Sequence, residues 1–329
     1  MLCQWRYVTV IRGYLAFNAT RGNLKGERNM SRLMLGVLLA VAFLVLEPAA
    51  TRAEDPPFIG WTALAPGLTT EYNPSSENDC TAGRTRCVDA VLREMGRRFE
   101  PLARSCDHDS IFALSYLRTT EEYRRTIEDP TFFEDTRFVN HEDAVFARLY
   151  FDAFDAWHAG RRHDVPAAWS IAFQAAADRA VNAQGNLSLG INAHIQRDLP
   201  FALAGIGLVK PDGSSRKTDH DRVNIFLNRV TDDLYAEIAR RFDPTVDDRN
   251  LPGTADDAGV FQLIPTWREI AWRNAERLVS APTPERRAEV AASIEAYAAS
   301  QAQLIRRAEA YPIGRDSSER DAYCAANHG

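Results

Sequence analysis

The residues best placed to do chemistry are a histidine and an aspartate in the segment G-I-N-A-H-I-Q-R-D-L-P, which spans 190–200. His194 and Asp198 are four residues apart, and on a helix this spacing puts both side chains on one face, one turn apart. Such a pair can bind one metal ion, or the carboxylate can orient the imidazole for proton transfer. The pair can equally be a buried polar contact that fixes the register of a helical core.

Two other polar clusters could complete a site around this pair. One is the stripe formed by His220, Asp221 and Asn224 beside the apolar face of a helix expected after Asp219, and the other contains Asp143, in the motif H-E-D at 141–143. The residues predicted to act in catalysis are His194, Asp198 and Asp221. The predicted substrate-binding residues are Asn192, Asn224 and His220. The predicted metal ligands are His194, Asp198, Asp143 and Asp221.

These residues favour a metal-dependent hydrolase that acts on phosphoesters, with zinc as the expected divalent metal. A metal ion would polarise a phosphoryl or carbonyl oxygen and lower the pKa of a bound water. The alternative is a non-catalytic helical protein that binds a small ligand or a partner, in which His194 and Asp198 form a structural pair. A metal-free acid/base enzyme built on the same pair is a third interpretation.

The stretch Asn192-Ala193-His194-Ile195-x-x-Asp198-Leu199, together with Asp221, Asn224 and Trp272, resembles an uncharacterised bacterial family of unknown function with the signature N-A-H-I-N-x-D-L. The resemblance covers most of residues 85–280 and implies no assigned activity, and Gln196 stands where the signature has asparagine.

The H-x-x-x-D spacing is also similar to that of the helical zinc-dependent phospholipase C and single-strand nuclease group, which is exported and all-α. That resemblance implies a zinc site and phosphodiester hydrolysis. That group also uses a mature N-terminal tryptophan as a ligand, whereas the expected mature N-terminus here is Glu54.

Apolar residues recur at a spacing of three to four from Arg84 to about Ala310, which predicts helices along this whole stretch. Pro200 is expected to kink or break its helix because its ring clashes with the carbonyl of Gln196. Asp219 is expected to cap the helix that follows it. No alternating strand pattern is present, so the predicted fold is an all-α, single-domain bundle of about eight helices. The expected helices span 84–102, 109–129, 139–159, 166–185, 187–204, 219–242, 261–279 and 283–310.

The N-terminal region has the layout of a signal peptide that starts at Met30. Its apolar run from Leu33 to Leu46 has 14 residues, fewer than the roughly 20 that a membrane-spanning helix needs. We expect cleavage near Ala53, no stable membrane span afterwards, and a periplasmic or secreted product; an uncleaved anchor is the alternative. The predicted segments are an extension before the true start (1–29), the signal peptide (30–53), an extended lead-in (54–83), the helical domain (84–310) and a tail held only by Cys324 (311–329).

Four cysteines remain once the leader is removed, an even number that suits an exported protein. Of the three possible pairings we favour Cys80 with Cys87 and Cys106 with Cys324. A helix of about 28 Å between Cys87 and Cys106 keeps those two thiols apart. A zinc-thiolate site is less favoured because no C-x-x-C motif is present.

The charge of the chain argues against nucleic acid as a partner. The chain carries a net charge of −6, and residues 1–53 contain seven basic and two acidic residues, so the expected mature protein carries −11. A phosphate backbone needs a basic footprint, which this protein lacks. The expected partner is therefore a small-molecule substrate or ligand.

Overall fold

The computed structural model of the chain describes residues 68–247 and 259–327, which belong to one compact unit, Asp55–Gly329. The described part is helical, and its only β pairings are isolated bridges between Val181 and Ala310 and between Val209 and Ser215. The predicted all-α fold is thus confirmed. The predicted extension, signal peptide and first part of the lead-in lie outside the described residues. The helices are α3 (Thr85–Ser105), α4 (Ser110–Thr126), α5 (Thr136–His158), η2 (Arg162–Asp164), α6 (Ala167–Ala177), α7 (Ala183–Asn192), η3 (Ala193–Asp198), α8 (Leu199–Ile206), α9 (Lys217–Arg241), η4 (Pro244–Asp247), α10 (Gly259–Ser280), α11 (Pro284–Ala308) and α12 (Ser318–Asn327).

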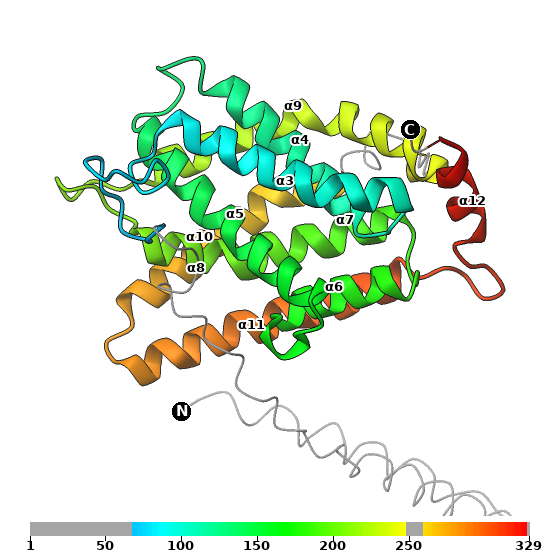
Figure 1. Ribbon diagram of the computed structural model, residues 1–329. Helices are drawn as coiled ribbons and strands as arrows, with labels where there is room; N and C mark the ends of the chain where they lie inside the picture. The colour runs from blue at the N-terminus through cyan, green and yellow to red at the C-terminus, as the bar shows by residue number, and fades with distance from the viewer. Residues whose placement is uncertain (1–67, 248–258, 328–329) are drawn as a thin grey trace, which may run out of the picture. The chain divides into compact units, whose positions relative to one another are not determined.

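The continuous helical segment α7–η3–α8 is the centre of the bundle. All six residues of η3 and nearly all of α7 are buried, the polar His194, Arg197 and Asp198 included, because other helices pack around this segment. In Figure 1, α7 lies between α3, α4 and α9 on one side and α6 and α11 on the other. At Gly190 a Cβ atom would lie 2.3 Å from the ring of Phe112, so the absence of a side chain allows α4 to approach α7 closely.

Pro200 does not break its helix, which was one of the two predicted outcomes. The preceding segment, Ala193–Asp198, is a π-helix, and Pro200 occupies the first turn of α8, where a proline is tolerated. The wider π turn takes up the change in backbone hydrogen bonding that the proline ring imposes. The helical backbone therefore continues without a break past the proline, with His194 and Asp198 on the wide turn.

Asp219 does not cap the helix that contains it. The helix α9 begins two residues earlier, at Lys217, and the Asp219 carboxylate accepts hydrogen bonds from the backbone N–H groups of Glu134 (2.7 Å) and Asp135 (3.0 Å). Asp135 in turn caps α5 through the N–H of Phe138. The side chain of Asp219 thus fixes the start of α5 rather than that of α9.

Two disulfides connect the cysteines as predicted, Cys80 to Cys87 and Cys106 to Cys324. The second ends on α12, a helix within the segment 311–329 that was predicted to be a tail.

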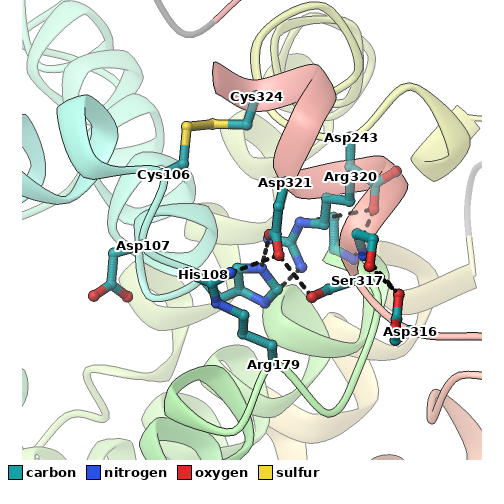
Figure 2. Close-up of polar contacts among 12 residues, drawn as sticks. Cys106, Asp107, His108, Arg179, Asp243, Asp316, Ser317, Arg320, Asp321 and Cys324 are labelled. Carbon is teal, nitrogen blue, oxygen red and sulfur yellow. Dashed lines mark hydrogen bonds and ion pairs between the residues drawn. A yellow bond between two sulfur atoms is a disulfide. The ribbon is translucent and has the colours of Figure 1, made fainter. Parts of the chain in front are cut away.

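Figure 2 shows that polar contacts, as well as the Cys106–Cys324 disulfide, attach α12 to the rest of the bundle. Asp321 accepts hydrogen bonds from His108 (2.8 Å) and Ser317 (2.7 Å), and buried Arg320 donates to Asn186 (2.7 Å). The prediction that Cys324 alone holds this region was wrong.

Within residues 68–247 and 259–327, no helix is long and apolar enough to cross a membrane.

Candidate functional site

His194 and Asp198 form a buried hydrogen bond on η3. The distance from His194 Nδ1 to Asp198 Oδ2 is 3.1 Å, and the two residues are 4% and 0% exposed. Trp169 of α6 donates its indole N–H to the same carboxylate oxygen at 2.8 Å. Because a carboxylate only accepts, the Nδ1 atom of His194 carries a proton, and Nε2 is the acceptor nitrogen of the neutral ring.

The other oxygen of Asp198 is occupied by a neighbouring cation. Arg197 donates to Asp198 Oδ1 at 3.0 Å and to Glu295 of α11 at 2.6 Å. The side chains of Arg197 and Glu295 are both buried. Burial lowers the pKa of His194, and the hydrogen bond from the ring to Asp198 only partly offsets this effect. The ring is therefore neutral at pH 7 although it lies beside a carboxylate.

Aromatic side chains surround the imidazole. The ring of Phe146 is stacked on that of His194, with centroids 3.6 Å apart and an angle of 9° between the planes. Tyr116 lies on another side, with its centroid 4.4 Å away. Neither Nε2 of His194 nor the hydroxyl of Tyr116 has a hydrogen-bond partner among the described residues, although both atoms are buried.

A cavity of about 120 Å³ adjoins the imidazole, and His194 forms part of its wall. Side chains from five helices and from η3 converge on it, and most of them are apolar. Phe112 and Tyr116 of α4, Phe146 of α5, Ile191 of α7, Phe226 of α9 and Ile264 of α10 contribute to this apolar surface.

Two carboxyl groups from the first half of α5 provide the acidic part of the wall. Burial raises the pKa of Glu142 to about 7, and the guanidinium of Arg268 limits the rise. Burial also raises the pKa of Asp143 to about 7, with a further contribution from the neighbouring Glu142 carboxylate. The Oδ2 atom of Asp143 is buried and has no hydrogen-bond partner.

Arg268 of α10 is the cationic group of the wall, and it is 5% exposed. It donates to the carbonyl oxygen of His220 at 2.7 Å and lies 3.2 Å from Nδ1 of the same residue. Burial lowers the pKa of Arg268 to about 10. His220, predicted to bind substrate, instead joins α9 to α10 through these contacts and through the carbonyl of Arg268 at 3.2 Å.

The structure does not bring the other predicted site residues into the cavity wall. Asp221 is exposed and pairs with Lys217 at 2.7 Å, because it lies on the solvent side of α9. Asn192 donates to the carbonyl of Ala298 at 2.9 Å and so connects α7 to α11. Asn224 is half-buried outside the wall.

The predicted four-residue metal site is not formed. Among residues 68–247 and 259–327, no three histidine, cysteine, aspartate or glutamate side chains are placed to hold a metal ion. Both Asp198 oxygens already accept hydrogen bonds, one of them from Arg197, whose positive charge opposes a divalent cation. These residues do not fit a zinc site.

Several residues of this site carry no signal in the sequence that would have identified them. Tyr116, Phe146 and Trp169 fit the apolar stripes of their helices, and Arg268 is one of three arginines on α10 that the sequence does not tell apart. Glu142 could have been found, since it adjoins Asp143 in the motif noted above.

Comparison with known proteins places the whole cavity in a recognised family. No curated protein and no solved structure matches the chain. A family of unknown function, DUF5995, matches residues 88–308, a range that contains every residue of the cavity wall. The match confirms the predicted membership of an uncharacterised family, but not the particular signature or the similarity to phospholipase C. The chain belongs to the family of unknown function DUF5995.

Proposed function

We propose that this protein binds a small, largely apolar molecule in the cavity, and that Nε2 of His194 accepts a hydrogen bond from it. The observation that carries the proposal is the unpartnered Nε2 atom of a buried imidazole in the wall of an apolar cavity. A buried acceptor without a partner costs about 1–3 kcal/mol, and a bound donor would remove that cost. Apolar cavities with a few convergent polar groups are the usual form of small-molecule sites.

A fragment screen followed by NMR of the histidine rings tests this proposal. We expect small aromatic alcohols or amines to shift the ¹⁵N resonance of His194 Nε2. Val223→Phe should abolish the shift, because Val223 lines the cavity and the larger ring would fill it. Ile225→Phe is the matched control, since Ile225 is 52% exposed on the same helix. A screen in which no fragment perturbs His194 would contradict the proposal.

Acid/base catalysis on the bound molecule is a second candidate function. The observation that favours it is the presence of three titratable groups in one wall, with the pKa values of Glu142 and Asp143 near 7 and a neutral His194 oriented by Asp198. Such values suit proton transfer at neutral pH. The rate of turnover of a substrate should then change with pH near 7. The variant His194→Phe should abolish turnover, although it keeps an aromatic ring at this position.

The metal-dependent phosphoester hydrolase stays a prediction from the sequence alone. Metal analysis of the purified protein tests it directly. One equivalent of zinc that is lost in His194→Phe and retained in Asp221→Asn would favour it over the proposal above.

We also propose that the protein acts outside the cytoplasm. Two disulfides support this location, because such bonds persist mainly in oxidising compartments. N-terminal sequencing of the mature protein should begin near Glu54.

A further inference from the structure

The unpartnered carboxyl oxygen of Asp143 points to the chemistry of the ligand. Its Oδ2 atom is buried without a hydrogen bond, and Asp143 lies in the wall of the cavity. The neighbouring charge that acts on it is the Glu142 carboxylate, which is repulsive. A buried carboxylate normally has a cationic partner, but among the described residues no cation contributes to the pKa shift of Asp143, which has burial and the Glu142 carboxylate as its causes.

The charges of the wall do not balance. Glu142 and Asp143 are acidic, Arg268 is basic, and His194 is neutral because its pKa is lowered by burial. When both carboxyl groups are ionised, the wall therefore carries one uncompensated negative charge. One positive charge in the cavity would neutralise it.

The remaining wall suits an organic cation rather than a hydrated metal ion. Phe112, Tyr116 and Phe146 present aromatic rings, whose faces attract an ammonium group. The cavity of about 120 Å³ compares with the engineered cavity of about 150 Å³ that binds benzene. A ligand with a single ring or a short branched chain would fill it.

We propose that the ligand of this cavity is a small organic monocation, an amine with one ring or a short branched chain, whose ammonium group pairs with Asp143. This inference rests on the proposed function, because it names the class of molecule that the cavity binds. The N–H groups of the ammonium would donate to Asp143 Oδ2, and one could also donate to the acceptor nitrogen of His194. Both atoms are buried and unpartnered in the absence of a ligand.

Three probes of similar size and different charge test the inference: benzylamine, benzyl alcohol and benzoate. Isothermal titration calorimetry at pH 7 should show benzylamine binding about 10- to 100-fold more tightly than benzyl alcohol, as expected for a hydrogen bond to a charged group. Benzoate should not bind. Benzylamine binding should also release protons, because a cation lowers the pKa of the adjacent carboxyl groups. Titrations in two buffers of different ionisation enthalpy measure this release.

Asp143→Asn should remove the preference for benzylamine over benzyl alcohol. Asp221→Asn, the same substitution at an exposed residue outside the wall, should retain it. The comparison of the three probes in the unmodified protein does not depend on either variant.

Equal or tighter binding of benzyl alcohol or benzoate overturns the cation inference and leaves the proposed cavity function intact. If none of the three probes binds, the inference is overturned as well. If, in addition, no fragment shifts the His194 resonance, the proposed function also fails.

Discussion

Gln196 on η3 is a buried polar residue whose role differs from that of its neighbours. It is 1% exposed, and in the part of the chain that the structure describes neither its amide nitrogen nor its amide oxygen has a hydrogen-bond partner. Arg197 and Asp198, next to it, make the hydrogen bonds described above. Gln196 also does not line the cavity, so its amide lacks a ligand that could satisfy it.

We therefore expect Gln196→Met to raise the free energy of unfolding by about 1–3 kcal/mol, because methionine keeps the shape of the side chain and removes two unsatisfied polar atoms. Denaturant unfolding measures the change. The matched control is Gln184→Met, which should destabilise the protein, since Gln184 accepts from Tyr235 at 2.8 Å and donates to Ser188 at 3.1 Å. A destabilised Gln196→Met variant would mean that a buried water satisfies this amide.

The attachment of α12 to the bundle should weaken in acid, because it depends on a neutral His108 ring. Burial and the adjacent Arg320 guanidinium lower the pKa of His108 to about 4, although Asp321 acts in the opposite direction. The neutral ring donates to Asp321 at 2.8 Å and accepts from Arg320 at 3.1 Å (Figure 2). Protonation would place a second cation beside Arg320, and so it opposes the attached state.

The attached form of α12 should therefore be stable above pH 6.5, the ordinary pKa of histidine, and lose stability as the pH falls towards 4. The rate at which a water-soluble phosphine reduces Cys106–Cys324 should rise about 10- to 100-fold between pH 6.5 and pH 4.5, since one pKa unit corresponds to a factor of ten. The Cys80–Cys87 bond in the same molecule is the internal control. Equal acceleration of both reductions would rule out a local effect of His108.

Most of the helices could be predicted from the sequence because apolar residues recur in them at a spacing of three to four. The helix α12 could not, because it is short and largely exposed and its buried anchors are Arg320 and Cys324 rather than an apolar stripe. The π turn at Ala193–Asp198 also escaped prediction, since Pro200 indicates that the hydrogen bonding must change but not how. Asp219 was misassigned because its partners are backbone groups 84 and 85 residues away in the chain.

The candidate site was predictable only in part. The contact between His194 and Asp198 is local, so the spacing of four residues indicates it. The cavity depends on five helices that pack around η3, and the sequence does not show which of their faces meet. Asp221 illustrates the limit, because its place on α9 is clear from the sequence but its orientation towards solvent is not.

On the scale of the whole molecule, the two disulfides should contribute very differently to stability. They close loops with sequence separations of 7 and 218. In the chain-entropy description the loss of Cys106–Cys324 should cost about 5 kcal/mol, and the loss of Cys80–Cys87 about 2.5 kcal/mol. Guanidinium unfolding of the two double Cys→Ala variants measures both. If the short bond proves to be the more costly one to lose, native-state packing rather than chain entropy sets its contribution.

The positions of the two disulfides in the chain also affect the order in which the bonds can form. At about 5–20 residues per second, the 218 residues that separate Cys324 from Cys106 take about 10 to 40 s to synthesise. During this interval the Cys106 thiol has no native partner, and Cys80 and Cys87 are the nearest thiols that it could capture. Early closure of the seven-residue loop removes both competitors. We therefore expect that, once the chain is in an oxidising compartment, early formation of Cys80–Cys87 reduces mispairing of Cys106 until Cys324 can bond to it.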